Sequence, residues 1–151
     1  MTESAFDIYQ RNCDEVARAV WDRDFDLALR HIGLPLRAVT PEADVTLRDE
    51  AALIQTLEEM RENLRKLGAT AFLRICREAD FYPGDDGRIH GSHMSYVLRG
   101  ATNLVPPYTS RMLLVRGPDG WQQTELISRV SNRHVTVLSE DIAVTHRTHT
   151  E

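Results

Sequence analysis

The amino-acid sequence predicts a single α+β domain in which N-terminal helices pack on one face of a curved antiparallel sheet. Two observations predict this class: apolar residues recur at helical spacing through much of residues 5–67, and four strand-like segments separated by turns follow in residues 69–131. A chain of 151 residues with 42% hydrophobic residues is long enough to bury such a core without disulfides or metals.

Three helices are expected before residue 68, each with an apolar stripe and residues suited to cap or end it. The first follows Ser4 as its N-cap, and glycines end the other two. They cover residues 5–22, 24–32 and 49–67. Residues 34–40 and 45–47, between the second and third helices, are expected to pair as a small hairpin.

The strands of the main sheet are expected where the hydrophobic period shortens, between turns rich in Gly, Pro and Asp. They cover residues 69–81, 88–99, 108–116 and 121–131. Residues 1–131 are therefore assigned to one domain and residues 132–151 to a C-terminal extension. In the extension, Val135, Val137 and Leu138 are candidates for a short edge strand, and a frayed tail is expected from Thr145.

The charge pattern excludes several classes of protein. The net charge is −5, with acidic and basic residues interspersed, so no basic surface is expected to bind nucleic acid. No apolar run is long enough to span a membrane, and the N-terminus has no secretory-signal pattern, so a cytoplasmic protein is expected. Cys13 and Cys76 both lie in apolar segments and are expected to be reduced core thiols.

No metal or cofactor is expected. His90 and His93 are three residues apart on one strand, so they face opposite sides of the sheet and cannot chelate one ion together. The chain has no glycine-rich phosphate loop and no nucleophile-elbow motif.

Strand alternation divides the last three strands into two faces, with Arg116 opposite Trp121 across the final turn. A slip of one residue at Pro106-Pro107 would invert the assignment of the strand before it. The first face carries Ser92, Met94, Tyr96, Leu98, Arg111, Leu113, Val115, Gln122, Thr124, Leu126 and Ser128. The second carries His93, Ser95, Val97, Tyr108, Ser110, Met112, Leu114, Trp121, Gln123, Glu125 and Ile127.

Three helices followed by a long antiparallel sheet of these lengths resembles the NTF2-like superfamily, also called SnoaL-like. The local likeness is an Asp119-Gly120-Trp121 turn that leads into a strand closing with Val130-Ser131. The resemblance implies a cone-shaped sheet wrapped around the helices, with a pocket inside. The superfamily includes ketosteroid isomerase, polyketide cyclases, dehydratases, ring-hydroxylating dioxygenase small subunits and non-catalytic transport factors, so it does not fix a role.

Aligning the last hairpin with that of ketosteroid isomerase makes the first face the concave one. Arg111 then falls where that enzyme keeps an oxyanion-stabilising aspartic acid, which is a departure from its pattern. An arginine buried in this apolar strand needs an anion or a carboxylate partner. Either it clamps a carboxylate or enolate ligand, or it forms a structural ion pair with a helix acid such as Asp22 or Asp24.

If Arg111 is catalytic, Tyr96 is the expected donor beside it, with Thr109 and Thr124 as orienting hydroxyls. Ser128 on the same face completes the expected ligand-binding set, together with Tyr9 from the first helix. The alternative for Tyr9 is a core tyrosine whose hydroxyl is satisfied inside the protein.

The second face is apolar and aromatic, and pairing with a second copy of the chain would cover it, so a homodimer through this outer face is expected. The main functional hypothesis is binding of a small anionic or carbonyl-bearing organic molecule. If the protein is an enzyme, a cofactor-free isomerase, dehydratase or cyclase is expected. The alternatives are a non-catalytic subunit, such as a ring-hydroxylating dioxygenase small subunit, and an interaction module with a filled cone.

Overall fold

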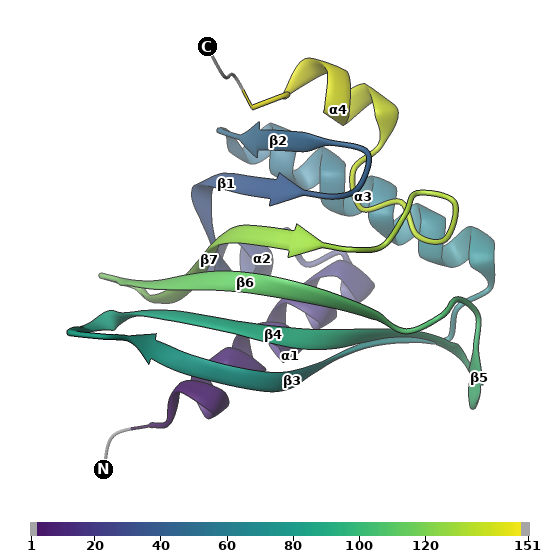
Figure 1. Ribbon diagram of the computed structural model, residues 1–151. Coiled ribbons are helices and arrows are strands. Elements are labelled where there is room, and N and C mark those ends of the chain that lie inside the picture. The colour runs from purple at the N-terminus through teal and green to yellow at the C-terminus, as the bar shows by residue number, and fades with distance from the viewer. Residues whose placement is uncertain (1–2, 149–151) are drawn as a thin grey trace.

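Helices lie on one face of a curved sheet in the computed structural model, which describes residues 3–148 (Figure 1). The capping residues expected from the sequence fix the helix ends. The Ser4 side chain accepts a hydrogen bond from the Asp7 backbone at the start of α1 (Ala5–Asp22), and Asp24 caps α2 (Phe25–His31) in the same way. Helix α3 (Glu50–Leu67) begins after Asp49 and ends at Gly68, whose φ of 81° suits glycine.

The sheet has the strand order β2-β1-β7-β6-β4-β3, and the short β5 pairs with the end of β4. Its strands are β1 (Ile32–Val39), β2 (Asp44–Leu47), β3 (Ala71–Tyr82), β4 (Asp85–Arg99), β5 (Thr102–Asn103), β6 (Tyr108–Gly117) and β7 (Gly120–Ser128). The α+β fold class with a curved sheet around the helices is therefore confirmed.

The expectation of a wholly antiparallel sheet is wrong at one pair, because β1 runs parallel to β7. The direction of β1 is set by α2, since the helix passes into the strand at Ile32 without an intervening turn. For the same reason Gly33 lies inside β1 and does not end the second helix as expected.

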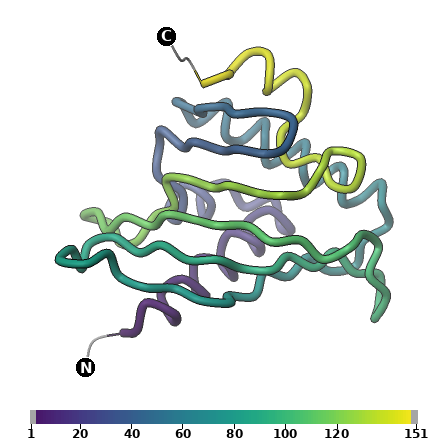
Figure 2. Tube along the Cα trace, in the orientation of Figure 1, coloured from purple at the N-terminus to yellow at the C-terminus, as the bar shows by residue number. Residues whose placement is uncertain are grey.

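The C-terminal segment after β7 crosses over the end of the sheet to reach β2, as the chain trace in Figure 2 shows. Val135, Val137 and Leu138 form no strand, contrary to the expectation, and are buried in the main core. Helix α4 (Glu140–Thr145) follows, and Arg147 makes an antiparallel bridge to Val45 of β2. The frayed tail expected from Thr145 is therefore wrong as far as Thr148, and its remainder, residues 149–151, lies outside the described residues. The apolar segment turns inward because its side chains close a part of the core that the sheet and α3 leave uncovered. No helix within residues 3–148 combines the length and the hydropathy needed to cross a bilayer.

The two faces of the sheet are the reverse of the expectation. Val97, Tyr108, Met112 and Leu114 of the second face are buried against the helices, and the face that carries Arg111 is outside. The physical reason is that the more apolar face gains more from burial under the apolar stripes of the helices.

A bulge in β7 changes which residues share a face. Leu114 pairs with Gln123, but Leu113 pairs with Glu125, so Thr124 is the extra residue. Beyond Thr124 the alternation is inverted, and Ser128 therefore lies opposite Ser110 on the inner face.

Gly91 of β4 allows α1 to lie close to the sheet. A Cβ atom at this position would lie 2.5 Å from the backbone oxygen of Glu78 and 2.7 Å from Cε2 of Tyr9. The absence of a side chain at Gly91 therefore makes room for the Tyr9 ring between helix and strand.

Replacing Gly91 with alanine is expected to destabilise the fold by about 1–3 kcal/mol, because the added methyl group overlaps a backbone atom and a buried ring. Urea unfolding measures the change. Gly117→Ala in β6 is the matched control, since its new Cβ would meet nothing closer than 3.9 Å. Equal stability of the two variants would contradict the close packing of Tyr9 on β4.

Candidate ligand-binding cavity

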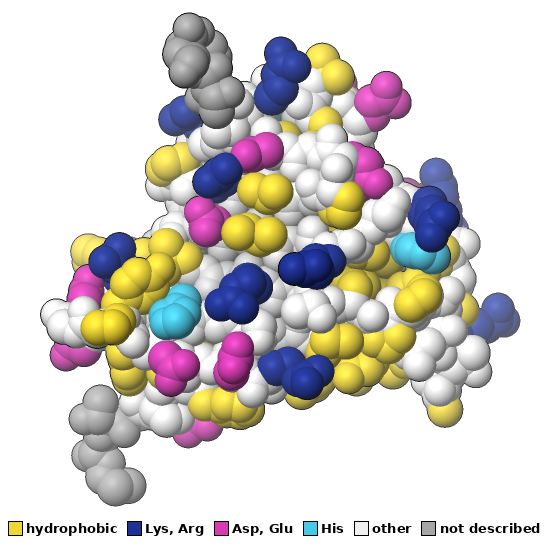
Figure 3. All heavy atoms as spheres, in the orientation of Figure 1, with side chains coloured by type: hydrophobic (Ala, Val, Ile, Leu, Met, Phe, Trp, Pro, Cys, Tyr) yellow, Lys and Arg dark blue, Asp and Glu magenta, His cyan; other side chains and the backbone are white. Residues whose placement is uncertain are grey.

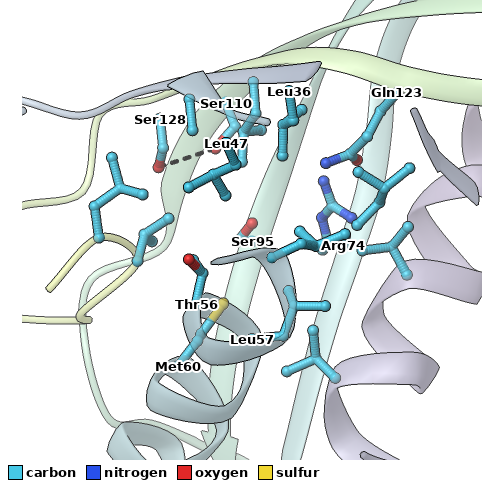
Figure 4. Close-up of a pocket in the computed structure, with 18 of the residues that line it drawn as sticks. Leu36, Leu47, Thr56, Leu57, Met60, Arg74, Ser95, Ser110, Gln123 and Ser128 are labelled. Carbon is cyan, nitrogen blue, oxygen red and sulfur yellow. Dashed lines mark hydrogen bonds between the residues drawn. The ribbon is translucent and has the colours of Figure 1, made fainter. Parts of the chain in front are cut away.

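A cavity lies between the inner face of the sheet and α3, with Val137 and Leu138 of the C-terminal segment on its wall. The cavity has a volume of about 70 Å³, enough for several waters or a small organic group. Aliphatic side chains form most of the wall (Figure 4). The polar side chains that line it are Thr56, Arg74, His93, Ser95, Tyr108, Ser110, Gln123 and Ser128.

Arg74 of β3 is the one charged side chain among the described residues that line the cavity, and it is only 6% exposed. Its Nε donates to Nε2 of His93 at 3.3 Å, and its Nη2 lies 3.0 Å from Sδ of Met112, a weak acceptor. Its Nη1 is buried and has no hydrogen-bond partner within residues 3–148. The ion pairs of the described residues do not include Arg74, so its charge is not balanced by a protein carboxylate.

The backbone that carries Arg74 is held by helix α1. Strand β3 is an edge of the sheet, and the Gln10 side chain takes the place of a neighbouring strand beside it. Gln10 Nε2 donates to the backbone oxygen of Arg74 at 2.8 Å, and its Oε1 accepts from the backbone N–H of Cys76 at 2.7 Å. These two bonds fix the strand at the point where the guanidinium enters the cavity.

His93 connects Arg74 to Tyr9 deeper in the protein. His93 is 1% exposed, and its Nδ1 lies 2.7 Å from the Tyr9 hydroxyl. Because Nε2 accepts from Arg74, the ring proton belongs on Nδ1, which donates to Tyr9. Burial, and then the nearby Arg74 charge, lower the pKa of His93 to about 2, so the imidazole is neutral at pH 7.

The hydroxyl groups in the cavity are protonated and act as donors or neutral acceptors. Burial raises the pKa of Tyr108 to about 12, although a hydrogen bond with Ser95 opposes the shift. Ser110 donates to Ser128 across the β6–β7 pair at 3.2 Å. The arrangement therefore offers a fixed cation and neutral polar groups to a ligand.

Gln123 of β7 lines the same cavity as Arg74, and the two side chains point toward one another in Figure 4. It is 3% exposed, and its Oε1 has no hydrogen-bond partner within the described residues. Arg74 and Gln123 thus bring an unfilled donor and an unfilled acceptor to the same side of the cavity.

The placement of Arg111 differs from both interpretations of the sequence. Arg111 is exposed on the outer face, opposite Ser92 on β4 and Ile127 on β7. It points away from the helices, so it neither lines the cavity nor pairs with Asp22 or Asp24. The expectation that Arg111 faces the interior is wrong because the faces of the sheet are reversed.

The cavity lining also lacks the three hydroxyl residues that were expected beside Arg111, which are Tyr96, Thr109 and Thr124. The Thr109 hydroxyl donates to Sδ of Met94, its partner across β4 and β6. Thr124 is the bulged residue of β7.

Ser128 lines the cavity, where the bulge in β7 places it. Tyr9 is fully buried and does not itself line the cavity. Its hydroxyl is hydrogen-bonded to His93, which does. The sequence interpretation missed Arg74, His93, Tyr108 and Gln123. Alternation in β3 was the available signal for Arg74, because Phe72 and Cys76 on either side of it mark an apolar, inward face.

Solved structures with a similar backbone identify the architecture. One is an NTF2-like protein of unknown function from Shewanella oneidensis, with a TM-score of 0.61 and 16% identity over 82% of this chain and 98% of that one. A domain of unknown function with a cystatin-like fold from Nostoc punctiforme gives a TM-score of 0.63 and 13% identity over 93% and 82% of the two chains. A designed NTF2 protein gives a TM-score of 0.63 and 10% identity over 81% of this chain and 96% of that one.

No protein-family model and no curated protein sequence matches the chain. The structural likeness establishes an NTF2-like fold, in agreement with the resemblance seen in the sequence. At these identities it carries no information about activity.

The neutral His93 makes stability depend on pH. Between pH 7 and pH 5 the unfolded chain protonates this histidine, whose ordinary pKa is 6.5, whereas the folded protein with its pKa of about 2 does not. Stability is therefore lost as pH falls, by about 2 kcal/mol at pH 5 from this residue. The pKa of His31 is also lowered by burial, and it adds a loss of the same sign.

His93→Gln is expected to reduce the loss of unfolding free energy between pH 7 and pH 5 by about 2 kcal/mol. Urea titrations at both pH values measure it. His90→Gln, on the outer face of the same strand, is the control and should keep the wild-type loss. An unchanged pH dependence in His93→Gln would show that His93 is protonated in the folded protein.

Proposed function

We propose that this protein binds a small organic anion in the cavity, with the anionic group on Arg74 and an apolar body against α3. The observation that carries the proposal is the buried guanidinium of Arg74, which has no carboxylate partner within residues 3–148 and an unfilled Nη1 donor.

Energetics favour a ligand over a structural role. Burying a charge without a partner costs several kcal/mol, and an arginine cannot remove the cost by losing its proton. An apolar side chain of similar length would fill the same space without this cost. A carboxylate ligand would restore the balance through charge-assisted hydrogen bonds, which are roughly twice as strong as neutral ones.

The lining supports binding better than acid–base catalysis. No Asp or Glu lies among the described residues that line the cavity, and His93 is neutral with both ring nitrogens engaged. Tyr108 keeps its proton at neutral pH, since its pKa is raised to about 12. An isomerase, dehydratase or cyclase needs a general base that these groups do not provide, whereas Arg74 and Tyr108 can stabilise negative charge on a bound molecule.

The second face, through which a dimer was expected, is buried against the helices, so a second proposal, pairing of two copies of the chain, rests on the opposite, outer face of the sheet that carries Arg111. Leu73 and Ile75 are each 45% exposed there, and Ile127 is 39% exposed. Figure 3 shows apolar side chains on this face with basic groups in the middle and acidic groups beside them. A surface with both signs of charge is complementary to an inverted copy of itself, so a two-fold dimer is the occupant that we propose.

Replacing Arg74 with methionine is expected to lower the affinity for hexanoate, a small carboxylate used as the probe, by roughly 10–100-fold. Hexan-1-ol, the neutral counterpart, should bind the two proteins alike. Isothermal titration calorimetry measures both ligands. The matched control is Arg111→Met, which removes an arginine from the outer face.

The stability of the ligand-free variant separates the two roles of Arg74. If the guanidinium serves a ligand, Arg74→Met should unfold at a urea concentration equal to or above that of the wild type, because an unpaired buried charge has been removed. A large loss of stability with unchanged hexanoate binding would instead make Arg74 a structural residue.

Ile75→Lys is expected to convert a dimer to a monomer by placing a charge in the apolar part of the outer face. Size-exclusion chromatography with light scattering measures the mass. Val144→Lys on α4 is the control, because Val144 is 76% exposed and lies off the sheet. A wild-type protein that is monomeric at high concentration would refute the pairing.

A further inference from the structure

Gln123 is a second buried polar side chain in the cavity with unfilled hydrogen-bonding capacity. Its backbone is fixed on both sides, because it pairs with Leu114 of β6 and with Ile32 of β1. Leaving a buried acceptor such as its Oε1 unpaired is unfavourable, in the same way as the unfilled Nη1 of Arg74. Two such groups on the lining of one small cavity, with their side chains pointing toward one another in Figure 4, indicate one ligand that engages both.

The chemistry of the two groups defines what the ligand must present. Arg74 offers a donor that carries a positive charge, so it calls for an anionic acceptor. The unfilled Oε1 acceptor of Gln123 calls for a donor on the ligand near that anion, while the Nε2 group of the same amide can donate to the anion itself. The Ser110 and Ser128 hydroxyls on the far side of the cavity already bind each other and make no comparable demand.

We infer that the ligand is a 2-hydroxy acid, whose carboxylate binds Arg74 while the hydroxyl on the adjacent carbon donates to Gln123 Oε1. This inference rests on the proposed anion site at Arg74. An ammonium group in the same position would bring a second positive charge close to Arg74, so 2-amino acids are disfavoured. Leu57 and Met60 of α3 line the cavity and suit an alkyl chain on the same molecule.

Three probes that differ in one substituent test the inference: hexanoate, 2-hydroxyhexanoate and 2-aminohexanoate, titrated by calorimetry. The wild type is expected to bind 2-hydroxyhexanoate roughly tenfold more tightly than hexanoate, the effect of one buried neutral hydrogen bond. 2-Aminohexanoate should bind more weakly than hexanoate. In Gln123→Leu the preference for the hydroxyl should vanish, so that hexanoate and 2-hydroxyhexanoate bind with equal affinity.

Gln122→Leu is the matched control, because Gln122 precedes Gln123 on β7 but bonds the backbone oxygen of Leu29 outside the cavity. It should keep the tenfold preference. Gln123→Glu is a second variant of almost the same shape. It places a carboxylate beside Arg74 and should weaken binding of all three probes.

The outcomes separate this inference from the proposed function. Hexanoate binding that depends on Arg74 but is not improved by the hydroxyl would overturn the 2-hydroxy acid and leave the anion site standing. The 2-hydroxy acid is likewise overturned if Gln123→Glu binds hexanoate as tightly as the wild type does. It is also overturned if Gln123→Leu is less stable than the wild type and the wild type shows no preference for the hydroxyl. In the last case the Gln123 amide would be the internal partner of Arg74. Failure of every probe to bind the wild type would overturn both proposals.

Discussion

The buried cation of Arg74 is the constraint on which the interior of this protein depends. Titratable groups near Arg74 carry no balancing charge: burial lowers the pKa of His93 to about 2, so its ring is neutral, and raises the pKa values of Cys13 and Tyr108 to about 12, so neither is an anion at pH 7. The fold also fixes the strand that carries it, through the side chain of Gln10. Because no acidic side chain of the described residues lines the cavity, the guanidinium remains available to an anion from solution.

Local sequence patterns were sufficient for the helices and most strands. Helix α1 begins where Ser4 can cap it, and α3 ends where Gly68 permits a left-handed turn. These features depend on neighbours within a few residues, so they can be predicted from the local sequence. The parallel pairing of β1 with β7 depends on residues about 90 positions apart, as the register Ile32 with Gln123 shows, and no local pattern encodes it.

The site was harder to predict because it depends on which face of the sheet the helices cover. The alternation of residues was correct from Tyr108 to Gln123, but the choice of face relied on an alignment that placed Arg111 inside. The greater apolar content of the opposite face, with Val97 and Leu114, was the physical criterion that decides burial. The bulge at Thr124 then moved Ser128 to the inner face, and a bulge leaves no mark in the period of a short strand.

The two outer strands of the sheet have partners that are not strands of the main ladder. The Gln10 amide bonds β3, while the backbone of His146 and Thr148 bonds β2 at Thr46 and Asp44. Open strand edges are the usual template on which unrelated chains polymerise into fibrils. Because helix α1 and the C-terminal segment occupy these positions, another chain could pair with β3 at Arg74–Cys76 or with β2 at Asp44–Thr46 only after one of them detached. Exposure of these two edge segments is thus governed by local unfolding of α1 and of the C-terminal segment, which can occur without unfolding of the core.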